Sequence, residues 1–218
     1  MTIQHHPDIA TLMSYAAGTL GEALGAVVAS HLDLCRECRR ETKRMAAIGG
    51  ALIEVEAVAP LSPEAESRAE AARQNAAIAT GSPAGARVLV AGLPRPLARR
   101  LGMPLADVAW KRLAPGAKYF PLPLSAGIEG DLRLLLIAPG VKMPEHGHGG
   151  TELTLVLKGS YRDEFGHYRA GDVEDVDSEA EHRPVIDSEA PCICLIASES
   201  KARFKGIVSR LMQPLTGM

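Results

Sequence analysis

The sequence has no long hydrophobic run. Its longest apolar stretch, Leu134–Ala138, is closed by Pro139 and Gly140, whereas a membrane-spanning helix needs about 20 apolar residues. The N-terminus also lacks the basic region and the continuous apolar run of a signal peptide. We therefore expect a cytoplasmic protein that has no membrane partner.

An excess of charge of either sign is also missing. The formal net charge is −2, with 23% charged and 46% hydrophobic residues among 218. Such a balance gives no reason to bind nucleic acid or an anionic membrane, and the absence of a basic helix or patch argues against a DNA-binding regulator. The length allows one large domain or two small ones, each with a real core.

Cysteines are few and occur in two pairs, Cys35/Cys38 and Cys192/Cys194. A reducing compartment disfavours structural disulfides and favours metal binding, redox sensing or burial. Cys192 and Cys194 stand two apart in an expected strand, so their side chains share a face at a Cα separation of ~6.5–7 Å, near the upper limit for a disulfide. We expect them to be buried as small hydrophobic residues; a sensing thiol pair is the alternative.

The first 80 residues show helical periodicity. Thr19 and Glu22 have the spacing of a capping box, which predicts a helix that starts after Thr19. Its apolar face is formed by residues at three- and four-residue spacing: Leu20, Leu24, Val27, Val28 and His31. We expect further helices over residues 8–17, over residues 37–58 (with Met45, Ile48, Leu52 and Val55 on one side), and after Ser62-Pro63.

Residues 81–99 are rich in glycine and proline and are predicted to be a linker. Beyond it, short apolar runs alternate with turn signals, which is typical of a small sandwich or barrel. The runs are Leu132–Ala138, Glu152–Leu157, Ile193–Ala197 and Phe204–Leu211. The fold class is therefore α + β in two domains, a helical one over residues 1–80 and a β domain over residues 100–218.

A first group of metal-binding residue types lies near the N-terminus. His31, Cys35 and Cys38 spell H-x3-C-x2-C, and zinc prefers about four tetrahedral ligands from imidazole and thiolate. If the first two helices pack antiparallel, the pair His5-His6 can supply the fourth ligand. We favour His6 because it precedes Pro7 and the helix start, and His5 stays open. An alternative to a metal site is a redox pair of thiols or simple burial.

A second group lies in the β region. His146 and His148 stand two apart and face the same side of a strand, and Glu152 begins the next apolar segment after a Gly149-Gly150 turn. A fourth ligand must come from a distant strand, where His182 is the best candidate and His167 the competitor. Three imidazoles and a carboxylate suit zinc, iron, manganese or nickel.

The second group, G-x5-H-x-H-x3-E-x6-G over residues 140–159, resembles the first motif of the cupin superfamily, and residues 168–184 resemble a loose form of the second. The N-terminal motif resembles the zinc-binding anti-sigma fold. Together they are similar to the ChrR family of anti-sigma factors over nearly the whole chain. The resemblance implies a cupin barrel over residues ~100–205 and two zinc sites, with the metal of the cupin site less defined. The implied ligands are His6, His31, Cys35, Cys38, His146, His148, Glu152 and His182.

The same resemblance implies a function. The helical domain would bind a sigma factor of the extracytoplasmic-function (ECF) type and keep it from RNA polymerase, and the cupin domain would be needed to release it in response to singlet oxygen or related oxidants. No catalytic residue and no direct nucleic-acid contact is expected. The competing interpretation is a dioxygenase-like cupin metalloenzyme with a helical accessory domain, since such a site supports oxygen chemistry when the metal keeps open positions.

Overall fold

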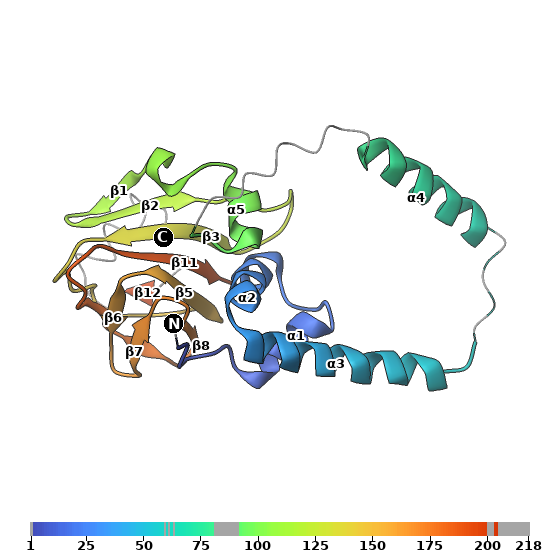
Figure 1. The fold of residues 1–218 in the computed structure, drawn as a ribbon, viewed down its shortest axis with the longest axis horizontal. Coiled ribbons are helices and arrows are strands. Elements are labelled where there is room, and N and C mark those ends of the chain that lie inside the picture. The colour runs from blue at the N-terminus through green and yellow to red at the C-terminus, as the bar shows by residue number, and fades with distance from the viewer. Residues whose placement is uncertain are drawn as a thin grey trace.

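A computed structural model describes residues 2–58, 60, 62, 64–80, 92–199 and 203–204. The helices come first in the chain and the strands follow, so the expected α + β class is confirmed (Figure 1). The helices are α1 (Ile9–Ala16), α2 (Glu22–Leu34), α3 (Arg36–Val55), α4 (Ala65–Thr80) and α5 (Arg95–Leu101), with a short 3₁₀ turn at Leu105–Asp107. In the described part of the chain, no helix is long and apolar enough to cross a membrane.

The first helix begins and ends as the sequence predicts. The Asp8 carboxylate accepts a hydrogen bond from the Thr11 N–H at 2.7 Å, which satisfies one of the free donors at the start of α1. Gly18, at φ 72°, lets the chain leave the helix in the left-handed region. A short turn then reverses the chain into α2.

The predicted start of α2 is wrong. Gly21 is the N-cap and makes no side-chain capping bond. The Thr19 hydroxyl donates instead to the Ser14 carbonyl at 3.2 Å, because the tight turn after α1 draws Thr19 back onto that helix. The apolar face of α2 is nevertheless the expected one, and four of its residues are buried: Leu24, Val27, Val28 and His31.

The apolar side of α3 is only partly covered. Met45 packs against the core, whereas Ile48, Leu52 and Val55 are 63%, 61% and 78% exposed. This half of the helix projects away from the rest of the molecule (Figure 1). The sequence could not separate a core face from an uncovered one, and the structure shows that the face is uncovered.

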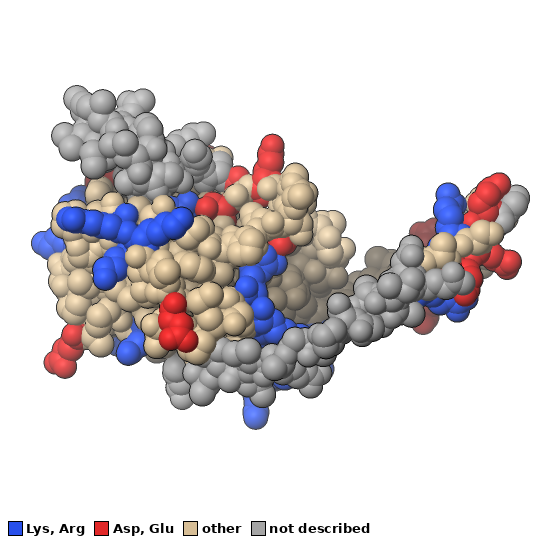
Figure 2. Space-filling view, turned by 90° about the horizontal axis from the view of Figure 1, so that it is seen from above, with Lys and Arg blue, Asp and Glu red and all other residues tan. Residues whose placement is uncertain are grey.

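Helix α4 stands apart from the body of the molecule and carries side chains of both charges (Figures 1 and 2). Residues 81–91 of the expected linker lie outside the described residues. The linker end at residue 99 needs correction, because residues 95–101 form α5, whose Leu97, Ala98 and Leu101 are buried. Ion pairs from Arg95 to Asp33 (2.6 Å) and from Arg100 to Glu22 (2.8 Å) join α5 to both ends of α2.

The strands form one large sheet and two small ones. The six-stranded sheet has the order β1-β2-β3-β11-β5-β8, and the two three-stranded sheets are β10-β6-β7 and β12-β4-β9. Gly159, at φ 76°, makes the turn between β5 and β6, where an added Cβ would lie 2.8 Å from the Ser188 hydroxyl oxygen. The strand bounds are β1 Lys111–Ala114, β2 Ala117–Pro121, β3 Asp131–Ile137, β4 His146–Gly147, β5 Glu152–Lys158, β6 Ser160–Arg162, β7 His167–Arg169, β8 Val173–Val176, β9 Glu181–His182, β10 Val185–Ile186, β11 Cys192–Ser198 and β12 Arg203–Phe204.

Both faces of the central strands β3, β11 and β5 are buried, which explains why these strands are almost continuously apolar. One face packs against α2 and α5, through residues such as Leu134, Leu155 and Leu195. The other face points toward the interior between the sheets, where Leu135, Val156 and other buried residues form a second hydrophobic cluster. Three of the predicted runs are β3, β5 and β11, and of the fourth only residue 204 is described.

We predict that Leu24→Ala lowers the free energy of unfolding by about 2–5 kcal/mol, the usual cost of a cavity at a fully buried leucine. Leu24 is 2% exposed and belongs to the cluster between α2 and the sheet. The matched control is Leu52→Ala on the exposed part of α3, which should change stability by less than about 0.5 kcal/mol. Urea unfolding followed by circular dichroism measures both, and equal effects would contradict the packing described above.

Candidate metal centres

The N-terminal group is assembled at the junction of α2 and α3. Cys35 is both the last cap of α2 and the N-cap of α3, so the two helices meet without an intervening loop. His31 lies in the last turn of α2 and Cys38 in the first turn of α3. The chain before α1 brings His6 to the same point, as antiparallel packing of the first helices would require.

The four side chains converge on one point. The Cys38 Sγ lies 3.3 Å from His31 Nε2 and 3.2 Å from His6 Nδ1, and the Cys35 Sγ lies 3.6 Å from His6 Nδ1. One ligand atom from each of the four lies within 4.8 Å of all the others. His5 points elsewhere, with its ring 4.6 Å from that of Tyr168. Of the two neighbouring histidines, His6 is therefore the one that lies beside the cysteines.

Burial favours the neutral forms of His31 and Cys38 when no cation is present. It lowers the pKa of His31 to about 4, and together with the nearby Cys35 it raises the pKa of Cys38 to about 12. Neutral imidazole is a metal ligand as it stands, whereas a thiol must lose its proton to a cation first. Two imidazoles and two cysteines at this spacing fit a closed tetrahedral zinc site.

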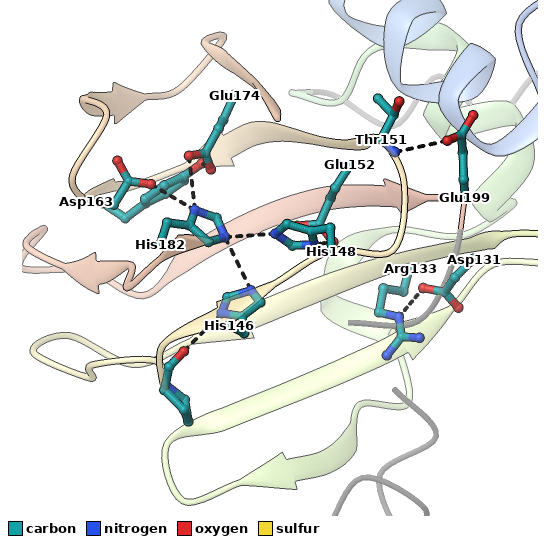
Figure 3. Close-up of polar contacts among 12 residues, drawn as sticks. Asp131, Arg133, His146, His148, Thr151, Glu152, Asp163, Glu174, His182 and Glu199 are labelled. Atoms are coloured by element: carbon teal, nitrogen blue, oxygen red, sulfur yellow. Dashed lines mark hydrogen bonds and ion pairs between the residues drawn. The ribbon is translucent and has the colours of Figure 1, made fainter. Parts of the chain in front are cut away.

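The C-terminal group lies between the sheets (Figure 3). His146 is on β4 and pairs directly with His182 on β9, while Glu152 is the first residue of β5. His148 follows β4 immediately and is 1% exposed. The distant strand thus supplies His182, and the competitor His167 instead lies 3.0 Å from Asp187 through its Nε2.

Three imidazole nitrogens face one another in this group. His182 Nε2 is 3.2 Å from His148 Nε2 and 3.3 Å from His146 Nε2. Glu152 Oε2 lies 3.2 Å from His148 Nδ1, a buried atom for which the described residues offer no well-aligned hydrogen bond. One ligand atom from each of the four lies within 4.8 Å of the others. Three imidazole nitrogens and a carboxylate oxygen brought this close together are a donor set that fits a divalent metal.

Two acidic residues that the sequence analysis did not identify contact His182 on the side of the ring opposite to the metal-binding group. Its Nδ1 lies 3.0 Å from Asp163 Oδ2 and 3.1 Å from Glu174 Oε1, and the Tyr161 hydroxyl donates to Glu174 Oε2 at 2.6 Å. Burial raises the pKa of Glu174 to about 7. Burial also acts to raise the pKa of Asp163, but hydrogen bonds with His182 and Glu174 outweigh it and lower that pKa to about 2. This arrangement orients Nε2 toward the centre of the group.

The space beside the C-terminal group is small. A cavity of about 50 Å³ is bordered by apolar side chains and by polar ones that include His146, Glu152, Glu174 and His182. Ligand pockets usually measure about 300–1,000 Å³, so this cavity suits a few water molecules rather than a sizeable organic substrate. Cys192 and Cys194 are buried free thiols whose sulfur atoms lie 3.6 Å apart on the interior face of β11.

We predict that the metal-free protein loses stability between pH 7 and pH 9 because of His182. Burial opposes its charged form, but hydrogen bonds to Asp163 and Glu174 outweigh burial and raise the pKa of His182 from 6.5 to about 10. A raised pKa stabilises the folded state fully below pH 6.5, and that contribution is lost as the pH rises through 10. Urea unfolding at several pH values should show this decline, and His182→Gln should flatten it. An equal decline in that variant would contradict the assignment.

The chain is similar to known proteins both in sequence and in structure. Residues 98–202 match the family of the ChrR cupin-like domain. The chain is 44% identical over 216 residues to anti-sigma-E factor ChrR of Cereibacter sphaeroides, with 98% of each chain covered. It also superposes on a chain of the crystal structure of Rhodobacter sphaeroides SigE in complex with the anti-sigma ChrR. That match has a TM-score of 0.72 and 42% identity and covers 90% of this chain and 99% of that chain.

A more distant match is an RmlC-like cupin protein from Ralstonia eutropha, at 20% identity and a TM-score of 0.42, covering 47% of this chain and 70% of that one. The similarity to the Cereibacter protein spans both the helical region and the β region, and therefore both candidate metal centres. The chain belongs to the ChrR family of anti-sigma factors.

Proposed function

We propose that this protein is a zinc-dependent anti-sigma factor that sequesters an ECF sigma factor in the cytoplasm and releases it in response to singlet oxygen or related oxidants. The observation that carries the proposal is the 44% identity, over 98% of the chain, to a protein named as an anti-sigma factor. The similar crystal structure of SigE in complex with ChrR supports a sigma factor as the partner.

The uncovered face of α3 is the surface that we assign to the sigma factor. Ile48, Leu52 and Val55 follow one another at helical spacing and are more than half exposed. The apolar residues of α2 are not available for a partner, because Leu24 and Val28 are buried against the sheet. An amphipathic helix with a free apolar side is suited to packing against partner helices.

Zinc at the N-terminal centre would be held by His6, His31, Cys35 and Cys38. These residues come from the segment before α1, from α2 and from the start of α3. Bound zinc would therefore connect these three segments at the N-terminal end of α3. Binding energy at such a site becomes folding energy of the segments that it joins. Oxidation of Cys35 and Cys38 would remove two metal ligands. The N-terminal end of α3 would then be held less firmly.

A metal at the C-terminal centre would be held by His146, His148, Glu152 and His182, and we propose zinc there as well. The enzyme interpretation has less support, since the cavity beside this centre has little room for an organic substrate. We assign this centre to sensing, and the proposed response is release of the sigma factor.

For the partner surface, we predict that Leu52→Asp weakens binding of the cognate ECF sigma factor at least about tenfold, which corresponds to about 1.4 kcal/mol. A charge at the centre of an apolar contact must be desolvated without a partner. The matched control is Ile128→Asp, an exposed apolar residue of the C-terminal domain (47% exposed), which should bind normally. Calorimetric titration of purified sigma factor into each variant measures the effect.

The same complex tests release. Illumination with a singlet-oxygen-generating dye should free the sigma factor, whereas dye in the dark should not. A chain that binds no sigma factor of its own organism would refute the proposed function as a whole. A complex that forms but survives illumination would refute only the sensing part.

For the metal, we predict two zinc ions per wild-type chain and one in Cys38→Ser, measured by mass spectrometry of metals after gel filtration. The variant should also bind sigma factor less tightly, because α1, α2 and α3 are no longer tied together. Cys194→Ser is the control, since Cys194 lies outside both groups of converging ligand atoms and should leave the metal content unchanged. Iron in the C-terminal centre together with turnover of a small molecule would favour the enzyme interpretation.

A further inference from the structure

The segment that carries His6 lies along an edge of the large sheet. Strand β8 is the last strand in the order of that sheet, so the backbone groups on its outer side are not paired with another strand of the sheet. The Val173 N–H donates to the His5 carbonyl at 3.1 Å, and the Asp175 carboxylate accepts from the Asp8 N–H at 3.0 Å. His6 is therefore placed by contacts with the C-terminal domain on both of its sides.

Asp172, in the turn between β7 and β8, makes the closest of these contacts. Its Oδ1 accepts hydrogen bonds from the Gln4 N–H at 2.7 Å and the His5 N–H at 3.2 Å, and its Oδ2 accepts from the Arg169 N–H at 2.8 Å. The residue is 1% exposed. Hydrogen bonds to a buried carboxylate are about twice as strong as neutral ones, so this side chain fixes the N-terminal segment to the turn.

The same turn contacts the second imidazole of the N-terminal centre. The Gly171 carbonyl lies 3.0 Å from His31 Nδ1, and both are buried. Donation from Nδ1 leaves the lone pair on Nε2, the nitrogen that lies 3.3 Å from the Cys38 sulfur. Such a contact behind a metal-binding histidine sets its tautomer and its ring orientation.

We propose that the turn at residues 171–172 of the C-terminal domain completes the N-terminal metal centre, with Asp172 and the Gly171 carbonyl as positioning groups for His6 and His31. The proposal rests on the N-terminal metal site proposed above and adds its dependence on the other domain. The consequence is that the affinity of the N-terminal centre for a divalent metal is not a property of residues 1–80 alone.

Cobalt(II) bound to the full-length protein tests this, because absorption from thiolate-to-cobalt charge transfer reports only the centre that has cysteine ligands. Cys38→Ser should abolish the band and so assign it. Competition with a chelator then gives the affinity of that centre. Asp172→Asn, which keeps the size of the side chain but cannot accept at both ends, should lower the affinity about 10–100-fold, the usual effect of losing a contact behind a ligand.

The matched control is Asp177→Asn. Asp177 also accepts backbone hydrogen bonds in a turn of the C-terminal domain, from Glu179 and Ala180 at 2.9 and 3.2 Å, and it should leave the affinity unchanged. Gln4→Pro removes one of the donors to Asp172 without altering the C-terminal domain. This variant should also lower the affinity of the N-terminal centre for cobalt, and it tests the proposal if the Asp172→Asn variant does not fold.

The outcomes separate the two proposals. A wild-type protein without the charge-transfer band would refute the N-terminal metal site and this inference with it. A wild-type band, together with affinities for Asp172→Asn and Gln4→Pro within twofold of the wild type, would refute the positioning role alone. Weakened cobalt binding in both variants, with the metal content of the C-terminal centre unchanged, is the result that we expect.

Discussion

Burial of both faces of the central strands β3, β11 and β5 is the constraint on which the rest of the structure depends. Alternate residues of one strand serve the two sides: Leu153 and Leu155 of β5 pack toward α2, while Glu152 and Thr154 border the cavity beside the C-terminal centre. The helical region therefore cannot leave the sheet without exposing apolar surface at about 25 cal/mol per Å². Helix α2 carries His31, so the same packing that forms the core also places the N-terminal centre against the β domain.

What the sequence predicted well depends on local geometry. His31, Cys35 and Cys38 lie within eight residues, and the helical period alone brings them to one end of two consecutive helices. The apolar face of α2 follows from the same period. The preference for His6 over His5 rested only on its place before Pro7, because the segment that carries both residues is held by backbone hydrogen bonds to Asp172, which lies 167 residues beyond His5.

The same distinction holds in the β domain. His146, His148 and Glu152 are close in sequence, whereas His182 enters through the pairing of β4 with β9. Asp163 and Glu174 had no sequence signal, since their role appears only once the register of the strands places both beside His182. The predicted capping box at Thr19 failed for a related reason: the turn after α1 uses the hydroxyl in its own hydrogen bond. Propensity and spacing describe a single segment, but they do not show which other groups compete for its hydrogen bonds.

Strand β8 gives the two metal centres a common support. The turn that leads into it, through Gly171 and Asp172, holds the imidazole of His31 and the segment that carries His6. Two residues after Asp172, Glu174 turns into the interior and holds His182 of the C-terminal centre. A ligand that favours one arrangement of a shared element changes the affinity at the other site by the same factor in each direction. One short segment thus contacts both centres, an arrangement consistent with our proposal that one domain senses and the other binds the sigma factor.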